Sequence, residues 1–187
     1  MHAKAEEILA FWLDEVGPEG WYEGGETLDA RCRRFEADWE RGVRGDFAQW
    51  TVEPRGALAL TILLDQFPRN MFRGSPKAFS SDRRARITCK GAIARDRDLG
   101  VEGAPRQFFY LPLMHSENLA DQDRSVRMFL LRFDSPDSLR HARAHRDIIR
   151  RFGRFPFRNA VLGRTSTPEE EARMAAGGYP AEVEALA

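Results

Sequence analysis

The fold depends on one stretch of sequence, residues 57–74, which reads ALALTILLDQFPRNMFRG. Its first part, Ala57–Leu64, is the most apolar run in the chain and is interrupted only by Thr61. A helix that is apolar on all sides is surrounded by other elements, so we expect a central helix that starts near Pro54. Proline lacks an amide donor and clashes with the preceding turn, which predicts that this helix stops or kinks at Pro68.

Apolar residues recur every three or four positions along the rest of the chain, and no strand-like alternation is present. This periodicity predicts an all-α protein. Proline, glycine and capping residues place the other helices at about residues 4–16, 27–43, 80–100, 105–111, 113–133 and 135–152, with one more starting at residue 167. One domain is expected for 187 residues, with a core over residues 4–172 and a weakly held tail over residues 173–187.

The composition is that of a globular chain, with 42% hydrophobic and 31% charged residues. No apolar run approaches the roughly 18 residues that a membrane span needs. The charged start, Met1–Glu7, is typical of a helix and not of a signal peptide, so we expect a cytoplasmic protein. Cys32 and Cys89 fall on apolar helical stripes, which favours buried reduced thiols over a disulfide or a catalytic thiol.

The net charge is zero, but the charges are unevenly distributed. Residues 1–53 hold 13 acidic and 6 basic side chains, whereas residues 124–164 hold 11 arginines and three acids. This asymmetry permits an anionic partner for the C-terminal part. The basic face of the helix expected over residues 135–152 lacks interleaved aromatic residues, which disfavours nucleic acid.

Two Phe-Pro motifs contain polar residues that helix formation alone does not require. They are Phe67-Pro68-Arg69-Asn70 and Phe155-Pro156-Phe157-Arg158-Asn159. Each motif delivers an arginine and an asparagine, and we expect two turns that form two walls of one pocket. The candidate ligand-binding residues from the motifs and their flanks are Asp65, Gln66, Arg69, Asn70, Arg73, Arg154, Arg158 and Asn159. Guanidinium groups recognise carboxylates and phosphates through paired hydrogen bonds. Alternatively, these arginines clamp Asp65, Glu117 and Asp121 in a buried structural network.

Histidines and acids supply the remaining candidates. His115 and Glu117 precede Asp121, and a helix through this segment would place Glu117 and Asp121 on one face, suited to acid–base work or to a metal. The alternative is that they cap a helix and pair with arginines. His141 and His145 lie one turn apart, as zinc ligands often do, but the glutamate of the zincin motif is missing. A core His145 bonded to a buried carboxylate is the preferred interpretation, and no metal or cofactor is expected.

Three segments in order resemble the DUF924 family of uncharacterised, mainly bacterial proteins. They are residues 64–70 (LDQFPRN), residues 111–117 (LPLMHSE) and residues 152–159 (FGRFPFRN), and the resemblance extends over roughly Ile8–Glu171. It implies an all-α superhelix similar to tetratricopeptide folds, and it implies no established activity. The family usually has a histidine where this chain has Phe157, so a ligand or base role for that histidine does not carry over.

These observations lead to three hypotheses about function. The preferred one is a helical domain whose polar pocket, lined by Arg, His and Glu, binds a small anionic ligand or an acidic peptide end. The second is a hydrolase for an anionic substrate with His115 and Glu117 as an acid–base pair, in which His115 is the base and Glu117 or Asp121 orients it. The third is a structural or protein-interaction scaffold.

Overall fold

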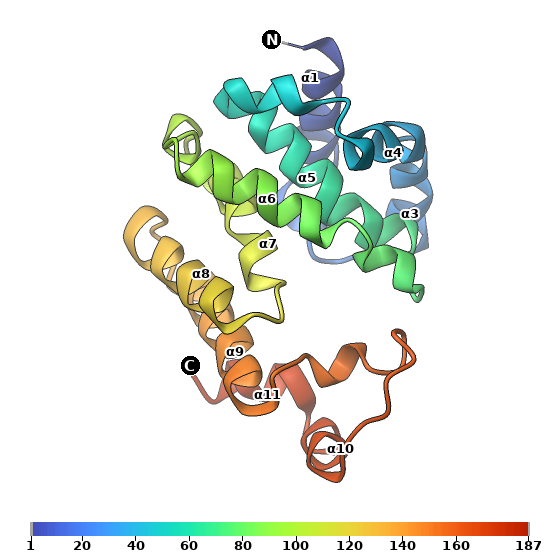
Figure 1. Cartoon of the computed structure of the whole chain (residues 1–187), viewed down its shortest axis with the longest axis vertical. Helices are drawn as coiled ribbons and strands as arrows, with labels where there is room; N and C mark the ends of the chain where they lie inside the picture. The colour runs from blue at the N-terminus through green and yellow to red at the C-terminus, as the bar shows by residue number, and fades with distance from the viewer. Residues whose placement is uncertain (1, 187) are drawn as a thin grey trace. The chain divides into compact units, whose positions relative to one another are not determined.

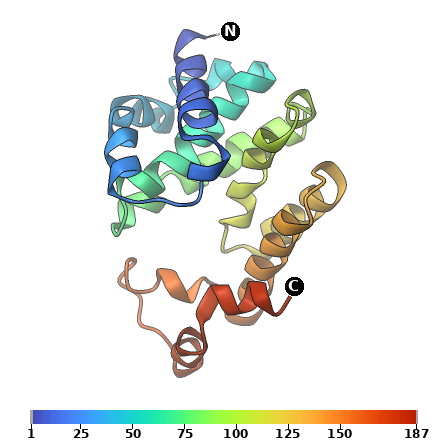
Figure 2. The same cartoon turned by 180° about the vertical axis from the view of Figure 1, so that it is seen from behind.

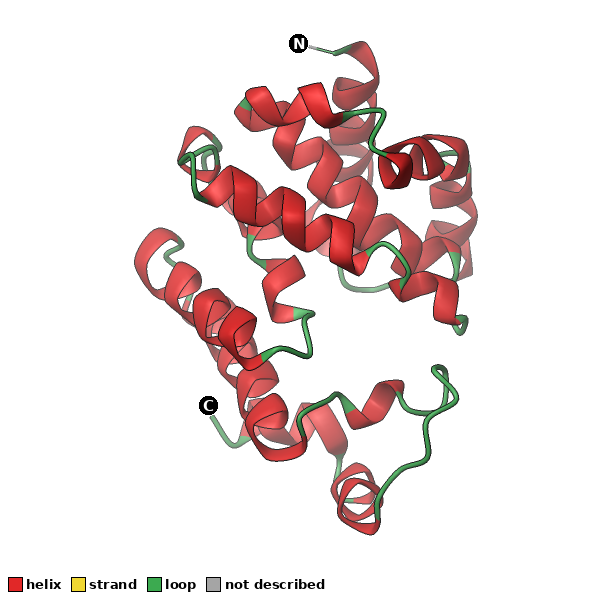
Figure 3. Cartoon of the chain, in the orientation of Figure 1, coloured by secondary structure: helices red, strands yellow, loops and turns green. Residues whose placement is uncertain are grey.

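The computed structural model describes residues 2–186, and within that range every regular element is a helix and none is a strand (Figure 3). This confirms the predicted all-α class. The chain divides into two compact units, residues 1–112 and 113–187, each with its own set of helices (Figures 1 and 2). The single domain expected from chain length stays a prediction, as does the superhelix implied by the family resemblance.

The first unit contains most of the helices. Its α-helices are α1 (Ala3–Leu9), α2 (Gly17–Gly20), α3 (Glu26–Arg33), α4 (Glu36–Arg44), α5 (Pro54–Met71) and α6 (Asp82–Ile93). Its 3-10 helices are η2 (Ala48–Val52), η3 (Pro76–Phe79), η4 (Asp98–Gly100) and η5 (Ala104–Phe109). A π-helix, η1 (Ala10–Val16), continues α1. Within it, the Trp12 carbonyl accepts a hydrogen bond from Trp21 Nε1 at 2.7 Å.

Helix α5 is the centre of this unit, as the apolar run predicts (Figure 1). Residues 56–68 are all buried, and α5 packs against α1, α3, α4 and α6 as well as η2, η3, η4 and η5. The N-terminal end of α5 passes so close to η2 that a Cβ on Gly56 would lie 2.3 Å from the Trp50 carbonyl oxygen. Only glycine is compatible with that approach.

The prediction that the helix stops at Pro68 and gives way to a turn is wrong, because α5 continues through the proline to Met71. The alternative of a kink at Pro68 stays a prediction. Proline cannot donate to the Leu64 carbonyl one turn earlier. The Ser81 hydroxyl donates to that carbonyl instead at 2.6 Å, and Ser81 Oγ accepts from Trp39 Nε1 at 3.0 Å. A side chain from outside the helix therefore replaces the lost helical hydrogen bond, and the helix is preserved.

Two other helices end earlier than the periodicity predicts. The helix expected over residues 27–43 is split into α3 and α4 at Arg34 and Phe35, and the Phe35 ring packs against Phe11 and Phe67, each with ring centroids 5.1 Å apart. Helix α6 ends at Ile93 and not at Gly100. Between them Asp96 adopts a left-handed backbone conformation, φ 54°, which is incompatible with a continuing helix.

The second unit is built on two long helices, α8 (Leu119–Arg132) and α9 (Pro136–Phe152), which pack against each other. The short helix α7 (Leu111–Met114) spans the division between the units, and α9 is followed by η6 (Pro156–Arg158), α10 (Pro168–Ala175) and α11 (Gly178–Glu184). Helix α11 packs on α9 (Figure 2). Its Tyr179 contacts the buried cluster of Ile148, Ile149 and Phe155. The expected weak attachment of residues 173–187 stays a prediction.

Within residues 2–186, no helix combines the length and the hydrophobicity needed to cross a bilayer. Both cysteines are free and buried in the first unit, as expected. Burial raises the pKa of the Cys32 thiol to about 12, so this thiol stays protonated at neutral pH.

Candidate functional site

The residues of the first Phe-Pro motif lie on the last turns of α5, where Arg69 is the central cation. Arg69 Nη1 and Nη2 donate to the two oxygens of Asp82 at 2.9 and 3.2 Å, and Nη1 lies 3.3 Å from Asp65 Oδ1. Asp65 is only 1% exposed. Burial acts to lower the pKa of Arg69, but the carboxylates of Asp65 and Asp82 outweigh it and raise that pKa. Arg69 therefore forms a buried ion triad within its own unit.

The other polar residues of this motif extend the same network. Gln66 Nε2 donates to the Asp65 carboxylate, and Asn70 Nδ2 donates to the Gln66 carbonyl at 3.1 Å. Arg73 Nη2 reaches Asn70 Oδ1 at 2.9 Å, and Arg73 also binds both oxygens of Asp29 at 2.8 and 2.9 Å. The structure thus brings all five predicted residues together, with both arginines ion-paired.

Glu117 belongs to the second unit, where it holds two chain segments together. Its Oε1 accepts from the Phe155 amide at 2.8 Å, and Arg164 donates to both carboxylate oxygens at 2.7 and 2.9 Å. Burial acts to raise the pKa of Glu117, but the hydrogen bonds from Arg164 and Phe155 prevail and lower it. Sequence reasoning missed Arg164, because it lies in a loop outside every motif.

Arg154 and Asn159 of the second Phe-Pro motif meet at Glu170, which is 2% exposed. Arg154 Nε and Nη2 donate to the Glu170 oxygens at 2.6 and 2.7 Å, and Asn159 Nδ2 donates at 3.2 Å. The hydrogen bonds from Arg154 come first among the causes that lower the pKa of Glu170 to about 2. Asn159 Oδ1 also accepts from Arg164 Nε at 3.0 Å, which links this pair to Glu117.

Glu170 was visible in the sequence only as part of a helix start. Thr167 caps α10 in a capping box, with Thr167 N donating to Glu170 Oε2 at 2.8 Å and Glu170 N donating to Thr167 Oγ1 at 3.2 Å. The Thr-Pro-Glu-Glu pattern predicts this cap but not its second use. Glu170 therefore serves as a helix cap and as the ion-pair partner of Arg154.

The expected pairing of Glu117 with Asp121 on one helix face is wrong, because α8 begins only at Leu119. Asn118 caps the helix by accepting from the amides of Ala120 and Asp121 at 3.0 and 3.3 Å. Glu117 lies before the cap and turns to Arg164. Asp121 accepts a hydrogen bond from the Ser116 hydroxyl at 2.9 Å. The two acids therefore have separate partners.

Three histidines gather in the second unit with Tyr179. His145 is buried, its Nδ1 lies 2.9 Å from the His141 carbonyl, and its ring packs edge-on against Phe155 at 5.4 Å. Burial is the main cause that lowers the pKa of His145 to about 3. His141 Nδ1 bonds the Tyr179 hydroxyl, and the His115 ring lies 6.3 Å from that of His145. In the part of the chain that is described, no three His, Cys, Asp or Glu side chains gather closely enough to hold a metal ion.

Arg158 lies beside this histidine cluster and is 7% exposed. Its guanidinium carbon lies 4.5 Å from the centroid of the Phe155 ring and 5.9 Å from that of Phe157. Its Nη1 donates to the His115 carbonyl at 3.0 Å. The cation is thus held in a fixed orientation by rings and by a backbone oxygen.

The residues predicted for one pocket form two sets. Asp65, Gln66, Arg69, Asn70 and Arg73 belong to the first unit, whereas His115, Glu117, His145, Arg154, Arg158 and Asn159 belong to the second. Within each set the side chains are connected through the contacts described above. The pocket shared by both sets stays a prediction.

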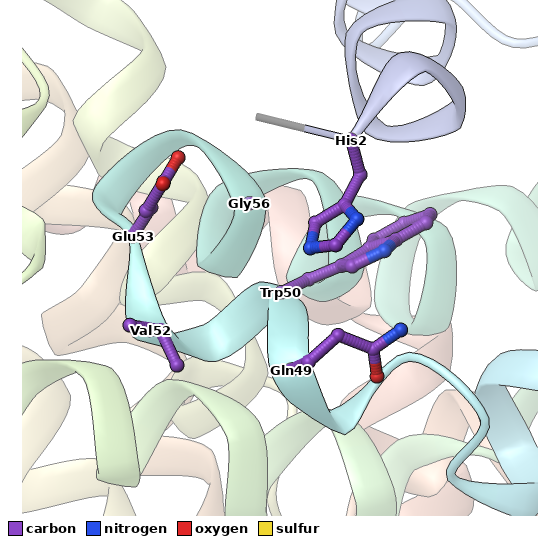
Figure 4. Close-up of a pocket in the computed structure, with 6 residues that line it drawn as sticks. All are labelled: His2, Gln49, Trp50, Val52, Glu53 and Gly56. Atoms are coloured by element: carbon purple, nitrogen blue, oxygen red, sulfur yellow. The ribbon is translucent and has the colours of Figure 1, made fainter.

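The first unit has a pocket of about 240 Å³ that is lined by none of the residues predicted to bind a ligand (Figure 4). His2, Gln49, Trp50, Val52, Glu53 and Gly56 line it. The His2 ring stacks on the Trp50 indole with centroids 6.0 Å apart, and Phe47 stacks on the same indole at 4.0 Å. The indole is therefore already engaged by rings of the chain itself.

Comparisons with known proteins agree with the fold and give no activity. The family model described as "Bacterial protein of unknown function (DUF924)" matches residues 8–178. The solved structure of a protein of unknown function from Agrobacterium tumefaciens has a TM-score of 0.87 and 39% identity, covering 92% of this chain and 97% of that one. No curated protein matches the chain.

Proposed function

We propose that this chain, which belongs to the DUF924 family of bacterial proteins of unknown function, is a binding protein. Its ligand would be a small anion or an acidic peptide end, held at Arg158. The observation that carries this proposal is the setting of Arg158, a buried cation oriented by the Phe155 ring and the His115 carbonyl. A guanidinium has five N–H donors in a planar fork, so a cation held this way is prepared for a carboxylate or phosphate.

The neighbouring carboxylates hold the other arginines of the second unit. Arg164 donates to both carboxylate oxygens of Glu117, and Arg154 donates to both of those of Glu170. Each of these arginines has a dedicated acid of its own unit, as Arg69 and Arg73 have in the first unit. Arg158 lies beside this network, since its positive charge also acts to lower the pKa of Glu117.

The histidines define the electrostatic surroundings of the proposed site. His145 has a pKa of about 3, so its ring is neutral at pH 7 and adds no competing charge beside Arg158. His115 is joined to Arg158 through its backbone carbonyl. We assign His115 and His145 to the wall of the site and Arg158 to direct contact with the anion.

The hydrolase hypothesis has less support than the binding hypothesis. In that hypothesis His115 is the base, and Glu117 or Asp121 has to accept a hydrogen bond from its ring to orient it. The hydrogen bonds from Arg164 and the Phe155 amide lower the pKa of Glu117 and keep it ionised. Glu117 is better suited to holding residues 155 and 164 in place than to orienting the His115 ring.

Thermal unfolding with and without an anion tests the proposal. Inorganic phosphate or citrate at 10 mM should raise the Tm of the wild type relative to sodium chloride of equal ionic strength. For a Kd of about 1 mM, binding to the folded state alone adds about 1.4 kcal/mol, or roughly 3–5 °C. The matched variants are Arg158→Gln and Arg143→Gln, since Arg143 is an exposed arginine of α9 in the same unit.

The proposal requires that Arg158→Gln loses the response to phosphate and citrate and that Arg143→Gln keeps it. Far-UV circular dichroism establishes that both variants are folded before the comparison. An equal response of wild type and Arg158→Gln, or no response of the wild type to either anion, would show that Arg158 does not bind the ligand.

A further inference from the structure

The first unit contains a groove of about 240 Å³ that none of the predicted residues lines. Helix α6 forms one side of it, and the end of α4 together with η2 forms the other, with Leu60 of α5 also lining it. On α6 the lining residues Arg84, Ile87 and Gly91 follow each other at three- and four-residue spacing, which places them on one face of the helix. Arg95, just beyond the helix, lines the far end.

The groove combines a hydrophobic centre with a cation at each end. Ile87 is 52% exposed and presents an aliphatic surface in the groove. Arg84 and Arg95 come from the two ends of the α6 segment, and no acidic residue lines the groove. This arrangement complements a ligand with an apolar centre and negative ends.

Both arginines are held in place by backbone carbonyls. Arg84 Nε and Nη2 donate to the Val43 carbonyl at 3.3 and 3.1 Å, and Arg95 Nη1 donates to the Gly91 carbonyl at 3.0 Å. Across residues 2–186, neither arginine forms an ion pair with a carboxylate, in contrast to Arg69 and Arg73 of the same unit. A fixed cation without an acidic partner attracts a carboxylate from another molecule.

Gly91 lets the Arg95 guanidinium lie close to the helix. Glycine inside a helix is less stable than alanine. A Cβ at position 91 would meet only the end of the Arg95 side chain, at 3.4 Å from Nη1, so the packing of the core does not demand glycine here. The missing side chain instead leaves room on the face that lines the groove for the Arg95 guanidinium, which donates to the Gly91 carbonyl.

We propose that this groove binds a short acidic peptide segment in extended form, with an aliphatic side chain on Ile87 and carboxylates on Arg84 and Arg95. The part of α6 from Arg84 to Ile93 spans about 13 Å, which an extended segment of about four to five residues covers. The inference uses the first unit alone and does not depend on the proposed role of Arg158.

Fluorescence anisotropy with a labelled hexapeptide tests the inference. The peptide has two central leucines flanked on each side by two glutamates, and a control peptide has glutamines in place of the glutamates. We expect the acidic peptide to bind the wild type and the glutamine peptide to bind at least tenfold more weakly. Arg84→Gln and Arg95→Gln should each weaken binding about three- to fivefold, in the range of a single partly exposed ion pair.

Three further variants separate the groove from other causes. Arg83→Gln removes an exposed arginine of the same helix that does not line the groove, and it should leave the affinity unchanged. Gly91→Ala should raise the Tm, because alanine favours the helix. It should also weaken peptide binding at least twofold, because the added methyl group narrows the groove. Arg158→Gln should have no effect on the peptide, and Arg84→Gln should leave the phosphate response of the wild type intact.

Several outcomes would overturn the inference. They are no binding of the acidic peptide at 1 mM, equal binding of the glutamine peptide, and equal binding by Arg84→Gln and Arg95→Gln. Loss of peptide binding in Arg158→Gln but not in Arg84→Gln would assign the peptide to the second unit and would also overturn the groove site. Because Arg84 and Arg95 are exposed, these substitutions leave the core of the unit unchanged.

Discussion

The two Phe-Pro motifs of this chain have similar sequences but different structures. Phe67-Pro68-Arg69-Asn70 lies inside α5, which continues through the proline to Met71. In Phe155-Pro156-Phe157-Arg158-Asn159 the proline is the first residue of the 3-10 helix η6. The surroundings decide the difference, since Ser81 satisfies the carbonyl that Pro68 leaves without a donor, whereas a proline at a helix start leaves none.

The arginines of the two motifs differ in the same way. Arg69 is enclosed by two carboxylates of its own unit, whereas Arg158 lies against two aromatic rings and the His115 carbonyl, and its charge also acts on Glu117. An ion triad that is complete within the fold stabilises the fold. A cation oriented by rings is better placed to recognise a ligand, so the contrast suggests a structural role for the first motif and a binding role for the second.

The largest effect is expected for Arg69→Met. This change leaves the buried carboxylates of Asp65 and Asp82 without their cation, and losing one partner of a buried ion pair costs about 3–5 kcal/mol. Urea unfolding followed by tryptophan fluorescence measures it, because all four tryptophans lie in the first unit. Arg83→Met, at an exposed site, is the control and should change the free energy of unfolding by less than about 0.5 kcal/mol. A loss below about 1 kcal/mol in Arg69→Met would return Arg69 to the list of ligand contacts.

The next effect concerns pH and distinguishes the two units. His145 has a folded pKa of about 3, below the ordinary value near 6.5, so the unfolded chain binds the proton more readily. The stability it contributes is complete above about pH 6.5 and is lost as pH falls toward 3, at up to about 1.4 kcal/mol per pH unit. Melting followed by far-UV circular dichroism between pH 7 and pH 4.5 should therefore show a steeper decline for the wild type than for His145→Phe.

The matched control for this pH effect is His2→Gln, because His2 is the histidine of the first unit and is exposed. It should leave the pH dependence unchanged. Tryptophan fluorescence, which reports on the first unit, should change less over this pH range than circular dichroism does. Identical pH dependence of wild type and His145→Phe would show that burial of His145 does not govern the acid sensitivity of the second unit.

The predictions that succeeded from sequence depend on local signals. The apolar run of residues 57–64 identifies α5, and Ser135-Pro136 with Gly153 brackets α9 almost to the residue. The break between α3 and α4 was not predictable, because the hydrophobic spacing continues through Phe35 and only the packing of its ring requires the break. The continuation of α5 past Pro68 depends on Ser81, which is 13 residues further along the chain.

The candidate site shows the same limit. Sequence patterns identified most of the charged residues that interact, but not which residues pair. Arg69 with Asp82, Glu117 with Arg164, and Arg154 with Glu170 are pairs that only the tertiary fold brings together. The alternative of a structural network therefore describes Asp65, which pairs with Arg69. Glu117 pairs instead with Arg164, which is not among the predicted arginines, and Asp121 is bonded by Ser116.

A smaller effect tests how α5 tolerates its proline. Ser81→Ala removes the hydroxyl that donates to the Leu64 carbonyl and accepts from Trp39 Nε1, which leaves two buried polar atoms without that partner. The expected loss is about 1–3 kcal/mol. In a Pro68→Ala background the new amide of residue 68 can donate to Leu64, so Ser81→Ala should cost at least about 1 kcal/mol less there. A double-mutant cycle in urea measures this coupling, and a coupling near zero would show that Ser81 does not compensate for the proline.

The smallest effect is expected for Pro156→Ala in the second motif. Pro156 occupies the first position of η6, where an amide has no partner within the helix, so restoring the N–H brings no hydrogen bond. The change raises the conformational entropy of the unfolded chain and removes part of a buried ring, and we expect the free energy of unfolding to fall by about 1 kcal/mol.

Pro156 and Ser81 belong to different units, and within residues 2–186 no hydrogen bond joins them to a common partner. The costs of Pro156→Ala and Ser81→Ala should therefore add to within about 0.5 kcal/mol, as they do for independent sites. Circular dichroism melting of the two single variants and the double variant measures the sum. A coupling as large as that between Pro68 and Ser81 would mean that the two motifs are not the separate structural solutions that their local geometry indicates.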